Sequence, residues 1–338
     1  MIPFLLACAL NPAGADLAPA IPKTIELRFR TQRSFALALP AESWSDLGQS
    51  LPTAIDGHPG YALSLEGGNL RVDTDGDGEL DVTVEGKEGL VTLRDTEGAA
   101  VSAVRLRRGA QGWQWSTSGS MVGKIGNIKV QLIDQNNNGR FDDFGEDAMI
   151  VGRGKDACYL SQVVSVAGQL ISVKPSADGR ELDLEEFEGA VGSLDLVTDC
   201  DSDAKLAWAV VKSADGKYSF DLAKAMGGQS LPAGEYLLER GRVALGKNHA
   251  TIQRGRSKAI AVPAGEEVSL DWGGPVKAEF GYQKAGGSLT FSPSDIDYYG
   301  AFGELYQNFL PLGKSPEFEV KDRLTGDVLV NAKFPGNC

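Results

Sequence analysis

Apolar and polar residues alternate with a period of two along most of the chain between Lys23 and about Val164. Side chains on a β-strand point to opposite faces in turn, so this alternation predicts strands with one buried and one solvated face. Turn signals rich in glycine or asparagine lie between these strands, at 66–68, 97–98 and 137–139, and predict short antiparallel hairpins. The pattern is clearest in residues 25–29, 61–65, 70–72, 82–84, 101–106 and 128–132.

The second half of the chain contains two internal echoes. Residues 173–180 and 211–217 share a Val-Lys start and an Asp-Gly turn, which predicts two similar hairpins. Residues 231–236, Leu-Pro-Ala-Gly-Glu-Tyr, are echoed at 262–267 and each copy precedes a β-prone stretch. This element resembles a strand entry of carboxypeptidase-regulatory-like and transthyretin-type sandwiches, and the resemblance supports a sandwich over residues 166–275.

These patterns predict an all-β fold of two or three antiparallel sandwich-like modules with hairpins closed by calcium loops. A chain of 338 residues is long enough for several cores, and 42 Gly and 15 Pro without a fixed period punctuate it as turns do. Helix is expected only as a turn or two near Leu222–Met226. The expected divisions are 1–15, a leader; 16–165, with both loops; 166–275, a sandwich; and 276–338, a small Ig-like module or a continuation.

The segment 73–81, Asp-Thr-Asp-Gly-Asp-Gly-Glu-Leu-Asp, carries the strongest local chemical signal. Carboxylates stand at positions 1, 3, 5 and 9 of a loop with glycine at position 6, and calcium prefers six to eight hard oxygen ligands. Four converging carboxylates would repel one another without a cation. The candidate ligands are the side chains of Asp73, Asp75, Asp77 and Asp81 and the backbone carbonyl of Glu79.

A second copy at 134–142 repeats these positions with amides at 3 and 5. Neutral amide oxygens lower the charge of the site, so we expect weaker calcium binding there, or a greater dependence on geometry. The candidate ligands are the side chains of Asp134, Asn136, Asn138 and Asp142 and the backbone carbonyl of Arg140.

Both loops resemble the EF-hand-like calcium loops of dockerins and thrombospondin type 3 repeats over about ten residues each. An EF-hand has a bidentate Glu at position 12, where this chain has Val84 and Gly145. The remaining ligands must come from elsewhere; Glu146 and Asp147 are candidates in the second loop. Strand-like flanks around the first loop indicate a calcium-clasped hairpin, not a helix pair. An Asp/Gly-rich turn without an ion is the alternative for each loop.

Charge and the first residues bear on location and partners. A formal net charge of -13 argues against nucleic acid as a partner, because nucleic acid requires clustered Lys and Arg.

Residues 2–10 are apolar and are followed by Ala13-Gly-Ala15, which indicates a signal peptide cleaved after residue 15. Cys8 within Leu-Leu-Ala-Cys is an alternative lipid-anchor site. No later segment has the ~18 apolar residues that a transmembrane span needs, and we expect an exported protein.

Cysteine and histidine are scarce. After a leader is removed, Cys158, Cys200 and Cys338 remain; a Cys158–Cys200 disulfide and three free thiols are the two alternatives. The chain has two histidines, His58 and His249, which leaves little material for His-based metal or nucleophile chemistry. We therefore expect a non-enzymatic protein more than an enzyme.

The sequence thus predicts an exported calcium-binding protein with a structural, binding or scaffolding role, whose partner could be a cell-surface protein or a polysaccharide. The alternative is a carbohydrate-binding or carbohydrate-processing protein. Trp113 and Trp115 motivate it because their rings lie on one side of a strand and could stack on a sugar, although packing in the core is the competing interpretation.

Overall fold

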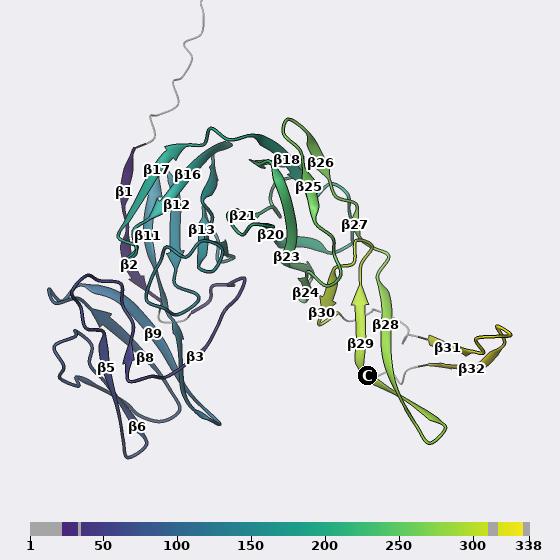
Figure 1. Ribbon diagram of the computed structural model, residues 1–338, viewed down its shortest axis with the longest axis horizontal. Helices are drawn as coiled ribbons and strands as arrows, with labels where there is room; N and C mark the ends of the chain where they lie inside the picture. Colours follow the sequence, from purple (N-terminus) through teal and green to yellow (C-terminus); the bar gives the residue numbers. More distant parts are fainter. Residues whose placement is uncertain (1–21, 33–34, 310–316, 334–338) are drawn as a thin grey trace, which may run out of the picture.

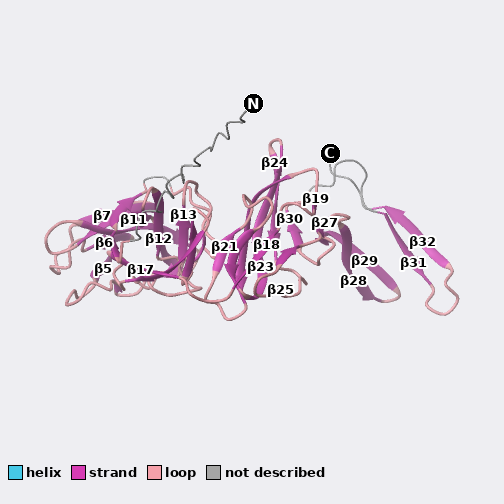
Figure 2. Ribbon diagram, turned by 90° about the horizontal axis from the view of Figure 1, so that it is seen from above, coloured by secondary structure: helices cyan, strands magenta, loops and turns pink. Residues whose placement is uncertain are grey.

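The computed structural model describes residues 22–32, 35–309 and 317–333. All the regular structure in these ranges is β-strand, and the fold is all-β with several antiparallel sheets, as predicted (Figures 1 and 2). No helix occurs in the described ranges, so none there could cross a bilayer. The strands form three groups, and a final hairpin lies beyond the third group (Figure 1).

The first group, here the N-terminal strand group, has two four-stranded sheets. One is β3-β10-β9-β8 and the other is β4-β5-β6-β7. Both contribute side chains to one hydrophobic cluster, which includes Tyr61, Val104 and Trp115. The strands are β3 (Ser45–Asp46), β4 (Ser50–Leu51), β5 (Tyr61–Glu66), β6 (Asn69–Val72), β7 (Val82–Val84), β8 (Glu88–Arg94), β9 (Ala100–Gly109) and β10 (Gly112–Thr117).

The second group, the central strand group, combines the start of the chain with its middle. Its sheets are β1-β17-β16-β15 and β14-β13-β12-β11-β2, and their cluster includes Leu132, Leu160 and Leu182. The strands are β1 (Thr24–Glu26), β2 (Arg28–Thr31), β11 (Gly119–Ile125), β12 (Ile128–Ile133), β13 (Ala148–Val151), β14 (Cys158–Tyr159), β15 (Val163–Val166), β16 (Gln169–Pro175) and β17 (Glu181–Glu186).

The third group, the C-terminal strand group, is built on a long sheet that contains β20, β21, β23–β25 and β28–β30. Two parallel pairs, β18–β26 and β19–β27, add to it. The strands are β18 (Val191–Asp195), β19 (Cys200–Asp201), β20 (Lys205–Ser213), β21 (Ser219–Asp221), β22 (Gln229–Pro232), β23 (Gly234–Leu245), β24 (Asn248–Gln253), β25 (Ile260–Val262), β26 (Glu267–Ser269), β27 (Trp272–Gly273), β28 (Lys277–Ala285), β29 (Ser288–Tyr299) and β30 (Leu305–Gln307). The final hairpin pairs β31 (Glu317–Lys321) with β32 (Val328–Lys333).

The six alternating segments of the first half are strands, as predicted. The expected strand at 25–29 is divided at Leu27, because β1 pairs with β17 whereas β2 pairs with β11 in another sheet. The side chain of Leu27 is buried, and its N–H donates to the Arg180 carbonyl. Leu27 is thus the point where the chain passes from one sheet to the other.

Strand pairing bears on the expected divisions. The boundary near residue 165 falls within the β15–β16 hairpin, whose strands share a sheet. Strands β28 and β29 continue the sheet of the C-terminal strand group. The central and C-terminal groups also share a core, because Trp208 and Val210 of β20 belong to the hydrophobic cluster of the central group.

Two smaller expectations have different outcomes. Residues 222–226 form turns and no helix, since Leu222 and Ala223 are held in the core by the end of β21. Cys158 and Cys200 are free thiols, so of the two alternatives for this pair the disulfide is wrong: Cys158 packs in the central cluster and Cys200 against the C-terminal one. The leader, the lipid-anchor site at Cys8 and Cys338 lie outside the described residues.

Candidate metal centres

The first acidic loop connects β6 to β7, which pair antiparallel, so the loop closes a hairpin as the sequence predicts. Asp73 directly follows β6, and its side chain is only 1% exposed. Carboxylate oxygens of Asp73, Asp75 and Asp81 all lie within 4.8 Å of one another. Three carboxylates at this separation repel one another, and a divalent cation between them would offset that repulsion.

Backbone N–H groups hold the buried carboxylate in place. The Asp73 side chain accepts hydrogen bonds from the N–H groups of Asp75 (3.1 Å), Gly76 (2.7 Å) and Gly78 (3.1 Å). Asp81 accepts from the N–H and the hydroxyl of Thr74, both at 2.8 Å, and these bonds lower the pKa of Asp81. The hydrogen bonds therefore orient two of the three clustered carboxylates, and they favour the ionised form of Asp81.

The remaining predicted ligands of the first loop are outside this cluster. Asp77 is exposed, and its carboxylate accepts a 2.7 Å bond from the N–H of Glu79. The Glu79 side chain is also exposed. The prediction assigned only the backbone carbonyl of Glu79 to a metal, and that assignment stays a prediction.

The second loop, between the paired strands β12 and β13, shares three of its hydrogen bonds with the first loop. At position 1, Asp134 accepts from the N–H of Gly139, at position 6, as Asp73 does from Gly78. The side chains at positions 3 and 5 accept from the N–H groups at 5 and 7 in both loops. The distances are 3.3 and 2.7 Å in the first loop and 3.2 and 2.8 Å in the second.

Backbone dihedrals show the same correspondence. Position 4 has a positive φ in both loops, +78° at Gly76 and +62° at Asn137. Position 6 does too, +90° at Gly78 and +80° at Gly139. Asparagine and glycine are the residues that adopt this left-handed conformation most readily. The two separate segments therefore share these backbone conformations as well as three hydrogen bonds.

The loops differ in the contacts of the acids at position 9 and beyond. Asp142, predicted at position 9, forms a two-bond ion pair with the Arg140 guanidinium at 3.0 and 2.8 Å. Asp143 lies beside the amides instead, because one of its oxygens accepts hydrogen bonds from the side chains of Asn136 and Asn138. Asp143 is thus a candidate ligand that the position pattern missed.

Two acids of the second loop are buried. Asp134 is 5% exposed and Asp147 is 1% exposed, and neither forms an ion pair with Lys or Arg within the described ranges. Burial raises the pKa of Asp134 to about 7. Burial, with repulsion from Asp134, raises the pKa of Asp147 to about 9. Asp147, one of the two acids that the sequence offered for completing the second site, accepts hydrogen bonds from the N–H groups of Gln135 and Asp143, whereas Glu146 is exposed.

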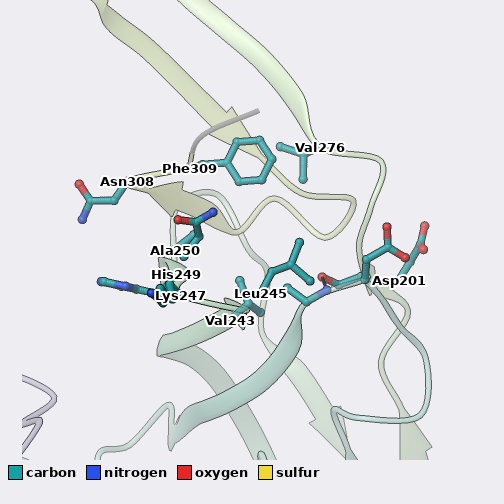
Figure 3. A pocket seen from close by; sticks show the side chains of 13 residues that line it. Asp201, Val243, Leu245, Lys247, His249, Ala250, Val276, Asn308 and Phe309 are labelled. Carbon is teal, nitrogen blue, oxygen red and sulfur yellow. Dashed lines mark hydrogen bonds between the residues drawn. The ribbon is translucent and has the colours of Figure 1, made fainter. Parts of the chain in front are cut away.

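Apart from the two loops, the C-terminal strand group has a surface pocket, referred to below as the hollow, between β24 and the chain after β30 (Figure 3). It has a volume of about 560 Å³, and apolar side chains such as Leu245, Val276 and Phe309 form much of its wall. Figure 3 shows Asp201 on one side of the hollow and His249 on the opposite side.

The paired residues Trp113 and Trp115 are 5% and 6% exposed in the N-terminal core, so the packing interpretation of that pair is confirmed.

Comparison with known proteins identifies no relative. No protein-family model matches the chain, and neither the curated proteins nor the solved structures include a similar one. The loops and the hollow are therefore the features from which a function is inferred.

Proposed function

We propose that this chain is an exported calcium-binding β protein in which two loops hold Ca²⁺ as structural elements of sandwich-like modules. The observation that carries the proposal is the cluster of Asp73, Asp75 and Asp81, whose oxygens lie within 4.8 Å of one another at the end of a hairpin. The shared hydrogen-bond pattern of the second loop supports it. The task of the protein would be binding or scaffolding at a cell surface or in the periplasm.

Calcium is favoured over other cations by the type of donor. The cluster offers carboxylate oxygens, and the predicted ligands add the backbone carbonyl of Glu79 but no sulfur and no imidazole. Zinc and copper favour nitrogen and sulfur donors, and magnesium demands a near-ideal octahedron, whereas calcium accepts irregular sets of six to eight oxygens. Because the ion would neutralise loop carboxylates in the folded state, its binding would add directly to the free energy of unfolding.

Counting bound calcium tests the proposal. Isothermal titration of the metal-free protein should give two sites per chain, and Asp73→Asn with Asp75→Asn should remove one. Calcium at about 100 times the dissociation constant of a site should add roughly 2.7 kcal/mol per occupied site to the free energy of unfolding. Glu88→Gln, which removes an exposed acid of β8, is the matched control and should keep both sites. A wild-type protein that binds no calcium at millimolar concentration would refute the proposal.

Carbohydrate binding is the second candidate, and the hollow in Figure 3 now favours it in place of the buried tryptophans. Phe309 offers an aromatic wall, and Asn248, His249 and Asn308 offer hydrogen-bonding groups around it. An aromatic face beside polar groups suits a sugar ring. Titration with a panel of soluble polysaccharides should detect binding that Phe309→Ala abolishes and Met226→Ala, at an exposed apolar position elsewhere, leaves intact. Absence of binding across the panel would remove this candidate.

A further inference from the structure

The second loop is also the place where the strand groups meet. The chain passes between the central and N-terminal groups twice, once on the way from β2 to β3 and again between β10 and β11. Both crossings lie against one side chain of the loop, Asn137, which is 6% exposed.

The Asn137 side chain binds each crossing directly. Its amide nitrogen lies 3.1 Å from the carbonyl oxygen and 3.1 Å from the hydroxyl of Ser43, and 3.3 Å from the hydroxyl of Ser45, at the entry to β3. Its carbonyl oxygen accepts a 3.1 Å bond from the N–H of Thr117, the last residue of β10. One side chain therefore joins both connections between the two groups.

Neighbouring residues of the loop add further ties to the connection between β2 and β3 and to the N-terminal group. Gln135 accepts bonds from Ala41 and Ser43, through its side-chain and backbone oxygens respectively. The carbonyl of Gly139 accepts a 3.1 Å bond from the N–H of Ala54. Gly139 also lies so near Pro52 that a Cβ there would be 2.7 Å from the Pro52 backbone.

The far end of the loop is tied to the other two groups. Phe141 packs in the central cluster, and its N–H donates to the Ala177 carbonyl at 3.0 Å. The carbonyl of Gly145 accepts a 2.7 Å bond from the Lys212 ammonium of β20. A segment of about a dozen residues thus contacts all three strand groups.

We propose that the loop 134–147 is a joint, and that a calcium ion held in it fixes the arrangement of the N-terminal strand group relative to the central one. The inference rests on the proposed function for the presence of the ion, and it assigns the two loops different roles. Asn137 stands between Asn136 and Asn138, which the ion would order, and the loop conformation at Asn137 aims its side chain at both crossings. The first loop lies within the N-terminal group and would stabilise that group alone.

The test measures calcium binding and joint order separately on the full chain. Hydrogen exchange at Thr117 and Ala54, whose N–H groups bond to the loop, reports on the joint, and small-angle X-ray scattering reports on the arrangement of the groups. In the wild type, calcium should slow hydrogen exchange at both amides by about tenfold or more. It should also narrow the distribution of interatomic distances obtained from the scattering. Asp73→Asn should lose one bound calcium and keep these changes, because it alters only the first loop.

Two variants of the second loop make the inference falsifiable. Asp147→Asn should lose the second calcium and, with it, the slowing at Thr117. Asn137→Gly suits the positive φ, keeps every candidate ligand and removes the tie; it should still bind two calcium ions while the slowing at Thr117 is lost. No calcium bound at the second loop would count against the proposed function itself. Two ions bound with no change in exchange or scattering, or an Asn137→Gly protein that retains the full change, would overturn the joint.

Discussion

Asp134 and Asp147 are an unusual pair, since buried carboxylates normally have a basic partner or are neutral. Their pKa values, raised to about 7 and about 9, differ from the value of about 3.9 that an aspartate has in an unfolded chain. Without a cation the folded state therefore holds protons that the unfolded state releases. This excess of bound protons makes stability depend on pH.

In the metal-free protein, the stability contributed by these two groups falls as the pH rises. The contribution of a raised pKa is fully present below about pH 4 and is lost as the pH rises through the folded values. In EDTA, the stability contributed by Asp134 and Asp147 should thus decline between about pH 4 and pH 9, and calcium should oppose the decline most strongly at alkaline pH. Urea unfolding at several pH values, with and without calcium, measures both effects.

Asp147→Asn serves as the diagnostic variant because it removes one titrating group and preserves the shape. Its stability in EDTA should vary less with pH than that of the wild type. Asp142→Asn, which removes a carboxylate of a partly exposed ion pair outside the buried pair, is the matched control. An identical pH dependence in the wild type and Asp147→Asn would show that the buried pair does not titrate in this range.

At the scale of the element, the two loops form a natural comparison because glycine at position 6 has nearly the same φ in each, +90° and +80°. Their surroundings differ. A Cβ on Gly78 would meet no atom within 4 Å, whereas one on Gly139 would lie 2.7 Å from the Pro52 backbone. The same substitution therefore separates backbone strain from the packing between strand groups.

Gly78→Ala should cost about 1–2 kcal/mol of stability, the strain of a left-handed alanine. Gly139→Ala should cost clearly more, because the new methyl also collides with backbone that cannot rotate away. Chemical unfolding in saturating calcium gives both values. Gly98→Ala, at a turn with φ +82° and open space, is a control for strain alone, and equal costs at 78 and 139 would contradict the close approach to Pro52.

The elements themselves follow from local signals to a large extent. Alternation predicted β5, β6 and β12, and the Asp-Gly turns predicted the β16–β17 and β20–β21 hairpins, because neighbouring residues in the chain determine both features. The pairing of β1 with β17 joins Thr24 to Asp183, and no local pattern contains that information. The same limit applies to the sites: positions 1, 3 and 5 could be predicted, whereas Asp143 was missed because its approach depends on how the chain returns after Phe141.

At the scale of the whole molecule, the strand groups are joined in two different ways. Trp208 and Val210 of β20 are 3% and 0% exposed and belong to the core of the central group, so the central and C-terminal groups share buried apolar surface. The N-terminal group has its own cluster, and its described ties to the central group include hydrogen bonds at the joint and the 2.7 Å Arg180–Asp95 ion pair. Shared cores couple unfolding more strongly than polar ties do.

This difference predicts the order of unfolding. Trp208→Ala should cost about 3–5 kcal/mol, as removal of a large buried side chain does, and should lower the unfolding midpoints of the central and C-terminal groups together. The N-terminal group should keep its own midpoint, which calcium at the first loop controls. Hydrogen exchange followed by mass spectrometry along a urea gradient can resolve the three groups in one experiment.

Trp208→Phe is the control. It retains most of the apolar surface and loses an indole N–H that has no partner in the described structure, so it should cost much less stability. Independent midpoints for the central and C-terminal groups in the Trp208→Ala protein would show that the shared core does not couple them.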